Sequence, residues 1–382
     1  MDQRTPLNLA YDAVAAARLV ASTAPFRAAA QDRDDGFPSD DVADLARLGL
    51  LAAPIPAEAG GAGLGDEPGA CALAEVLRLV GYGSLALGRL YEGHVNALHL
   101  VATHGDAAQR ARLFADARAG HLFGVWNTEP PDNGLVLREA EGGLQLGGVK
   151  TFASGAGYVT RALVTARRDG VPGTLMLVMP LEHGTRADLS AWQSQGMRAS
   201  ATGTLDFTGL PVRDEDILGE PDSYSRQPAF SGGAWRFAAV QLGGIEAVFD
   251  AWRAHLARTG RGGDPHQLAR LGEGALALEG ARNWVKRGAE TVSDAILPPE
   301  RIVATINLVR LAVERAGLDV LQLAQRSVGL QGFLRGHPLE RLSRDLATYL
   351  RQPAPDGALI GAAVEILKAD GFVGDLWDGD VT

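Results

Sequence analysis

The stretch FGVWNTEPPDNGLVLREAEGGLQLGGVKTFAS, from Phe123 to Ser154, decides the fold of this chain. It combines short β-type runs with turn glycines and a polar Asn-Thr-Glu cluster. Roughly 120 residues of Ala-, Leu- and Arg-rich helical pattern precede it, and roughly 150 more follow its β unit. A small β unit between two helical blocks places a ligand site where the three parts meet. We therefore expect this stretch to form one wall of a cofactor site.

Periodicity, together with the intervening Gly and Pro residues, divides the rest of the chain into helices and strands. Helices are predicted over residues 7–30, 42–48, 70–80, 85–104, 107–117, 235–256, 267–293, 307–327, 339–350 and 356–369. Strands are predicted over residues 135–146, 149–153, 161–166, 174–179 and 203–207. The predicted fold class is α+β, mainly α. Its expected parts are an N-terminal helical domain (1–120), a middle β-barrel or sandwich domain (121–225) and a C-terminal helical bundle domain (226–382).

Composition limits the classes of partner. The 382-residue chain is 46% hydrophobic and carries a net charge of -10, so it can bury a large core and has no general basic field for nucleic acid. The single cysteine, Cys71, cannot form an intramolecular disulfide and is expected to be buried, which suits a reducing cytoplasm. No run reaches the roughly 18 uncharged apolar residues of a membrane span. A cytoplasmic protein is predicted.

Four segments, in this order, resemble the acyl-CoA dehydrogenase family, and the likeness runs from about Phe37 to Leu367. They are FP at 37–38 with GGAG at 60–63, WNTEP at 126–130 with GVKTFAS at 148–154, GMRAS at 196–200 followed by DF at 206–207, and GLQGF at 329–333 with PLER at 338–341 and RD at 344–345. One such match is weak, whereas four in register are strong. The resemblance implies the acyl-CoA dehydrogenase fold, with its C-terminal four-helix bundle, bound FAD, and a homotetramer or homodimer.

A flavin needs a flat apolar slot with hydrogen-bonding groups at its polar edge. The residue types of Trp126, Phe152, Thr128 and Ser154 suit such a slot. The resemblance implies flavin contacts for four residues of the central stretch: Asn127, Thr128, Phe152 and Ser154. Ordinary strand roles also explain the two hydroxyl residues, and a core position explains the tryptophan.

For the cofactor's diphosphate, the resemblance implies Arg258 and Gln267, commonly supplied by a neighbouring subunit. Because the segment from Thr259 to Gly263 departs from the family pattern, Arg261 is an equal candidate, and a solvated-loop role explains either arginine. Gly329 and Gly332 would let the backbone approach the far end of the cofactor.

The catalytic base is where the sequence departs from the resemblance. A dehydrogenase of this type removes the proton α to a thioester with a carboxylate that faces the flavin. The two positions that the family uses fall on Pro353 and near Trp235-Arg236, and neither offers a carboxylate. Asp356 is the nearest candidate catalytic residue, although we favour a helix-capping role for it.

The predicted function is FAD-dependent α,β-dehydrogenation of an acyl-CoA or related small-molecule substrate, with a flavoprotein or reductase as electron partner. One alternative is a flavin-dependent monooxygenase of the same fold that uses reduced flavin and O2. Another is a non-catalytic member of the family. No metal site is predicted, because His94 and His99 are five residues apart and no His-Glu-x-x-His motif occurs.

Overall fold

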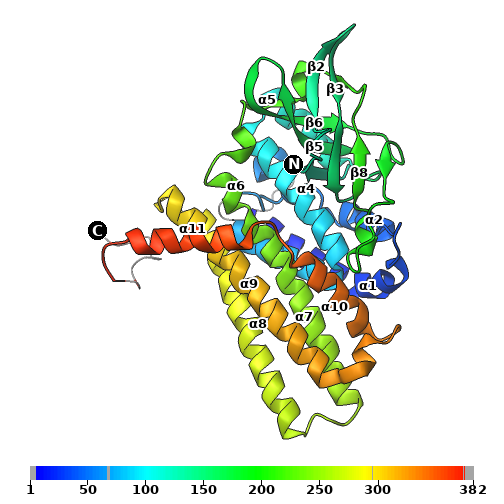
Figure 1. Ribbon diagram of the computed structural model, residues 1–382, viewed down its shortest axis with the longest axis vertical. Helices are drawn as coiled ribbons and strands as arrows, with labels where there is room; N and C mark the ends of the chain where they lie inside the picture. Colours follow the sequence, from blue (N-terminus) through cyan, green and yellow to red (C-terminus); the bar gives the residue numbers. More distant parts are fainter. Residues whose placement is uncertain (1–5, 67–68, 295, 373, 375–382) are drawn as a thin grey trace.

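The computed structural model describes residues 6–66, 69–294, 296–372 and 374 (Figure 1). The N-terminal part is helical, with α1 (Pro6–Gln31), α2 (Ser39–Arg47), the 3-10 turn η1 (Ala57–Ala59), α3 (Ala70–Gly83), α4 (Leu85–His104) and α5 (Ala107–Arg118). Local capping sets two of the helix starts. Ser84 accepts a hydrogen bond from Leu87 N at the start of α4, and Asp106 forms a capping box with Gln109 at the start of α5.

The middle part is a strongly curled β unit of two sheets. Its strands are β1 (Phe123–Trp126), β2 (Val136–Ala140), β3 (Gly143–Gly147), β4 (Val149–Ala153), β5 (Arg161–Arg168), β6 (Val171–Pro180), β7 (Ala187–Asp188), β8 (Gly203–Asp206), β9 (Pro211–Val212) and β10 (Ile217–Leu218). The larger sheet has the order β10-β6-β5-β2-β3-β9, with β1 parallel to β5, and the smaller sheet has the order β4-β8-β7. The turn η3 (Arg198–Ser200) precedes β8.

The C-terminal part is a set of long helices that pack side by side (Figure 1). It contains α6 (Ala229–Gly232), α7 (Ala234–Arg258), α8 (Pro265–Val292), α9 (Pro299–Val328), η6 (Gly329–Phe333), α10 (Pro338–Tyr349) and α11 (Pro355–Lys368). Helix α7 packs directly on α3. A Cβ atom on Gly243 would lie 1.9 Å from Arg78 O, so only glycine permits this approach.

One hydrophobic core crosses all three parts. Tyr91 of α4, Trp126 of β1 and Trp235 of α7 all belong to it, and each is at most 3% exposed. The predicted fold class is confirmed: a mainly helical chain with a helical N-terminal domain, a β middle domain and C-terminal helices. The expectation for Cys71 is wrong, because this residue of α3 is exposed. Among the described residues, every helix is too short or too polar to cross a bilayer.

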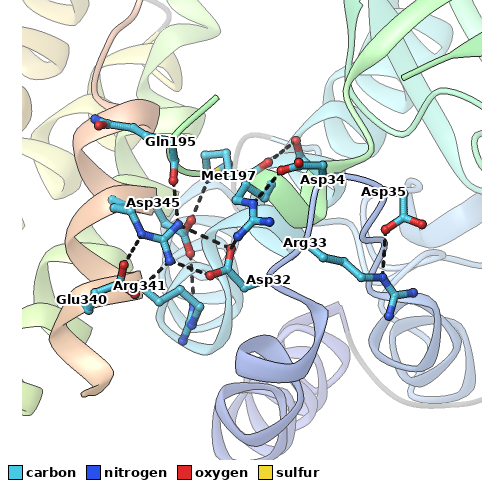
Figure 2. Close-up of polar contacts among 12 residues, drawn as sticks. Asp32, Arg33, Asp34, Asp35, Gln195, Met197, Glu340, Arg341 and Asp345 are labelled. Carbon is cyan, nitrogen blue, oxygen red and sulfur yellow. Dashed lines mark hydrogen bonds and ion pairs between the residues drawn. The ribbon is translucent and has the colours of Figure 1, made fainter. Parts of the chain in front are cut away.

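Two neighbouring residues of α10, Arg344 and Asp345, form polar contacts between the bundle and the rest of the molecule (Figure 2). Arg344 Nη2 lies 2.5 Å from Asp32 Oδ2, just beyond α1, and Arg344 Nη1 donates to Gln195 O at 2.6 Å. The neighbouring Asp345 accepts a hydrogen bond from Met197 N at 2.7 Å. These contacts hold α10, and therefore the loop that follows it, in place against the β unit.

Candidate functional site

We call the stretch from Phe123 to Ser154 the β wall. It presents an aromatic side chain in an unusual backbone conformation. Strand β4 pairs with β8, and the register shifts between Lys150 and Ala153. Within this irregularity Phe152 has φ +52° and a side chain that is 65% exposed. A bulge re-aims a side chain, and a positive φ costs a non-glycine residue about 1–3 kcal/mol. The strand is therefore bent so that an aromatic ring faces away from the core.

Polar groups lie beside this ring. Thr151 N, next to Phe152, donates to Thr128 O at 2.9 Å, which joins the segment after β1 to β4. Asn127 and Thr128 are both exposed. The Asn127 side chain accepts from Thr165 Oγ1 at 2.5 Å, so its carbonyl end is fixed in the sheet and its amide nitrogen remains available as a donor.

Trp126 and Ser154 form the inner end of the wall. Trp126 is 3% exposed, and its indole nitrogen donates to Ser154 O at 3.0 Å. The Ser154 hydroxyl accepts from Arg89 Nε at 3.3 Å and from Thr202 Oγ1 at 3.2 Å. Trp126 therefore belongs to the core, whereas Ser154 connects the β wall to α4.

A buried ammonium supports the wall from behind. The Lys150 side chain is 0% exposed, and its Nζ donates to Asn127 O at 3.1 Å, Glu129 Oε2 at 2.8 Å and Thr165 Oγ1 at 3.1 Å. Burial lowers the pKa of Lys150, and Glu129 opposes that change. Burial alone would raise the pKa of Glu129, but the hydrogen bonds from Lys150 and Leu135 N, together with the charges of Lys150 and Arg167, outweigh burial and lower the pKa. All three donors of the ammonium are used.

Helix α4 carries a polar stripe through an otherwise apolar interior. Its members are spaced three, four, three and four residues apart: Arg89, Glu92, Asn96, His99 and Thr103. That spacing puts them on one helical face. We call this face the α4 stripe.

The α4 stripe is hydrogen-bonded to α7. Glu92 is 2% exposed, and its two carboxylate oxygens accept from Arg89 Nη1 at 2.5 Å and from the Asn96 amide. Asn96 Oδ1 in turn accepts from Arg236 Nε at 2.5 Å. Arg236 makes no other hydrogen bond within the described part of the chain, so its two terminal nitrogens are unpaired.

Four members of the α4 stripe, all except Arg89, line a cavity together with Arg236, between α4, α7, α9 and the loop after α10. Its main lobe has a volume of about 430 Å³ and is lined by Glu92, Asn96, Arg310 and Pro353, among others. A second lobe of about 270 Å³ extends past Leu73 and Trp235. Both lobes are lined by His99 and Arg236. These are typical dimensions of a small-molecule site.

Two histidines of α4 differ in their surroundings. His94 is fully buried, its Nε2 donates to Leu51 O at 2.7 Å, and its Nδ1 accepts from Phe123 N at 3.1 Å. Burial lowers the pKa of His94 to about 4. His99 faces the cavity, where burial, Arg236 and His104 lower its pKa to about 3. Both rings are therefore neutral at neutral pH. Of these two histidines, only His94 has both ring nitrogens hydrogen-bonded within the described part of the chain.

Burial also acts on the cations of the cavity. It lowers the pKa of Arg236 to about 10, while Glu92 opposes the change. Burial also lowers the pKa of Arg310, and the charge of Glu314 opposes this change. A guanidinium whose pKa is depressed is poorly solvated in its charged form.

The far end of the bundle holds a second polar group. Arg258 is exposed beside His255, whose Nδ1 lies 3.1 Å from His337 Nε2. Gln267 is 2% exposed and contacts Ser327. The amide orientation that satisfies its neighbours puts the Gln267 nitrogen on Ser327 and its oxygen toward Arg261, at 2.5 Å, and Arg270, at 3.2 Å.

The remaining predicted site residues lie in three different settings. Gly329 has φ +72° at the end of α9 and has open space around its Cα. Gly332 packs tightly, since a Cβ there would lie 3.0 Å from Leu339. Asp356 is exposed in the first turn of α11, whereas the residues of this segment that line the main lobe are Gln352, Pro353 and Ala354.

Sequence reasoning missed the cavity residues of α4. Only the two histidines of this helix were singled out, and they were considered only as metal ligands. A signal was present, because five polar residues at helical spacing interrupt a helix that is otherwise apolar enough for the core. Arg236 gave no local signal: its partner Asn96 is 140 residues away in the sequence.

Comparison with known proteins agrees with this architecture. The model of the acyl-CoA dehydrogenase N-terminal domain matches residues 13–121, and that of the C-terminal domain matches residues 225–350. Together they cover more than half of the chain. The protein therefore belongs to the acyl-CoA dehydrogenase family.

The chain is also similar to proteins named as a monooxygenase and a nitrososynthase. The chain is 26% identical to dibenzothiophene monooxygenase of Rhodococcus erythropolis, over 88% of this chain and 89% of that protein. It is 28% identical to L-evernosamine nitrososynthase of a Micromonospora species, over 90% and 87%. The crystal structure of FMN-bound TdsC from Paenibacillus sp. A11-2 superposes with a TM-score of 0.83 at 19% identity, over 96% of this chain and 100% of that chain. This last likeness shows the fold.

Proposed function

We propose that this protein is a flavin-dependent monooxygenase that oxygenates a small molecule in the cavity beside the α4 stripe. The observation that carries the proposal concerns the two positions where a dehydrogenase of this family would hold its base. Pro353 and Arg236 both line the cavity, so the positions face the site, but neither is a carboxylate. A site without a base there is not equipped to remove an α proton from a thioester.

The buried carboxylate of the cavity does not replace that base. Both oxygens of Glu92 already accept hydrogen bonds, one from Arg89 and one from Asn96. A substrate proton would have to compete with these two donors for the carboxylate oxygens. The role of Glu92 in the proposal is to hold Arg89 beside Ser154 and Asn96 beside Arg236.

The residues of the wall fit a flavin. Exposed Phe152 offers a ring face, while Asn127, Thr128 and Ser154 offer donors and acceptors beside it. A reduced flavin, when bound, supplies the electrons that activate O2. The oxygenase names of the relatives and the FMN of TdsC favour FMN as the flavin; FAD is the prediction made from the family resemblance alone.

The flavin's phosphate needs cations, and we propose that Arg258 supplies one from a second copy of the chain. Arg258 is exposed, and it lies beside His255 at the end of the bundle. Gln267 is taken up by contacts with Ser327 and Arg261, so its proposed part is to orient Arg261. Replacement Arg258→Ala is expected to weaken FMN binding about tenfold, measured by fluorescence quenching of the flavin.

The reaction itself is tested with a flavin reductase, NADH, FMN and 18O2. The trial substrates are one acid, benzenesulfinate, and two neutral compounds, indole and dibenzothiophene. Mass spectrometry measures label in the product. We expect one 18O atom per product molecule. The same protein, loaded with oxidised flavin and mixed anaerobically with butyryl-CoA, is expected to keep its flavin absorbance. Bleaching by the thioester without label incorporation would overturn the proposal in favour of dehydrogenation.

Dehydrogenation remains the second candidate, with Asp356 as its predicted base. One observation favours it: Asp356 lies only two residues beyond Ala354, which lines the cavity. Under this alternative, Asp356→Asn abolishes the bleaching of flavin by butyryl-CoA, while Glu365→Gln, a charge change on the same helix, leaves it intact.

A further inference from the structure

The cavity contains a cation with unused hydrogen-bonding capacity. Arg236 donates through Nε to Asn96, and within the described chain its two terminal nitrogens have no acceptor. They are not sealed in the core, since Arg236 lines both lobes of the cavity. Two parallel N–H groups of a guanidinium match the two oxygens of a carboxylate or sulfinate.

The charges around the main lobe favour an anion. Its lining includes Arg236 and Arg310 as cations and Glu92 as the acidic residue. Glu92 is already paired with Arg89, so the lobe carries an uncompensated positive charge. The smaller lobe is different, because an acidic residue that is not paired with Arg89, Asp66, also lines it.

The second cation of the main lobe plays a different part. Arg310 donates to Pro353 O and lies 5.7 Å from the centroid of the Phe237 ring. It therefore holds the loop after α10 while adding its charge to the field. Phe230, Phe237 and Leu100 supply an apolar surface in the same lobe.

We infer that the substrate is a small organic acid whose carboxylate or sulfinate group binds the two free terminal nitrogens of Arg236. Its apolar body lies against Phe230 and Phe237 in the main lobe. This inference rests on the proposed function for what happens to the substrate, but the binding itself does not depend on any reaction. Burying an unpaired cation is costly, and an anionic ligand removes that cost, which a neutral isostere does not.

The test is a binding measurement on the holoenzyme with oxidised FMN, without reductant. The probes are benzoate, benzenesulfinate and hexanoate, each with a neutral match: benzamide, methyl phenyl sulfone and hexanamide. Isothermal titration is expected to show at least one acid binding about tenfold or more tightly than its match. A panel in which no acid exceeds its neutral match would overturn the inference.

Variants locate the anion. Arg236→Gln is expected to remove the preference for the acid, and Arg236→Lys to keep part of it, because the charge remains and the two-pronged geometry is lost. Arg351→Gln is the matched control: this arginine is 58% exposed, pairs with Glu314 and is not among the residues lining the cavity. Preference retained in Arg236→Gln, or lost in Arg351→Gln, would count against the assignment.

A measurement on the wild-type protein does not depend on whether a variant folds. His99 shares the cavity with Arg236, and the positive charge of Arg236 helps to lower the pKa of this histidine. An acid bound at Arg236 must weaken that effect, so the NMR signals of His99 should shift on adding the acid and not on adding its neutral match. Unmoved His99 signals in the presence of bound acid would exclude the site. Because no oxygenation is measured, failure of the 18O2 experiment leaves this result standing.

Discussion

Lys150 and Arg236 are two enclosed cations with opposite circumstances. Lys150 has three acceptors for its three donors, and all of them belong to the protein. Among the residues that the structure describes, Arg236 has one acceptor for five donors, and it lines a cavity. Burial depresses the pKa of both. The number of satisfied donors, rather than burial, therefore separates a structural cation from one suited to a ligand.

The largest expected effect separates the two cations by the same substitution. Lys150→Met leaves a carbonyl, a carboxylate and a hydroxyl without their donor and should lower the free energy of unfolding by about 3 kcal/mol. Arg236→Met removes one hydrogen bond and an incompletely paired charge, so it should change that free energy by less than about 1 kcal/mol. Urea unfolding followed by circular dichroism measures both. Equal losses in the two variants would break the comparison.

The buried His94 of α4 provides a second test, through the dependence of stability on pH. The folded pKa of His94, about 4, lies below the ordinary value of 6.5. A depressed histidine contributes stability above pH 6.5, and this contribution is lost as the pH falls toward 4, because the unfolded chain takes up the proton first. The wild type should therefore lose about 3 kcal/mol more than His94→Gln between about pH 7 and about pH 4. Parallel stability curves for the two proteins would contradict this.

The smallest effect concerns the backbone at Phe152. Phe152→Gly and Phe152→Ala both remove the exposed ring, so both should weaken FMN binding to the same degree. Only glycine adopts the positive φ without strain. The free energy of unfolding of the Gly variant should therefore be about 1 kcal/mol higher than that of the Ala variant. Thermal unfolding and flavin titration of the pair measure the two effects separately. An Ala variant as stable as the Gly variant would show that the bulge stores no strain.

Much of the fold was open to prediction from local pattern. Gly83 and Gly105 bracket the predicted helix 85–104, and the structure gives α4 the same bounds. The strand predicted over residues 149–153 rests on similarly local reasons, and the structure gives β4 the same bounds. Its place beside a flavin came from the family resemblance. Such bounds depend on neighbours in the sequence, and periodicity reports them directly.

The cavity was harder to predict because its parts meet only after the domains dock. Pro353 and Trp235-Arg236 were noted as positions without a base, yet nothing local indicates that Arg236 meets Asn96. The bulge at Phe152 also escaped prediction, since a register shift depends on the partner strand β8. Pairing across a long stretch of sequence is set by packing, which a single sequence does not display.

The contact of Arg344 with Asp32 joins residues 312 positions apart. During synthesis α1 leaves the ribosome long before α10 has been made. Until then, Asp32 lacks its contact with Arg344. Contacts of such separation form late, and apolar surface stays accessible to chaperones meanwhile. A chain that ends before Arg344 would lack this contact, and the apolar surface that α10 covers in the folded protein would stay exposed.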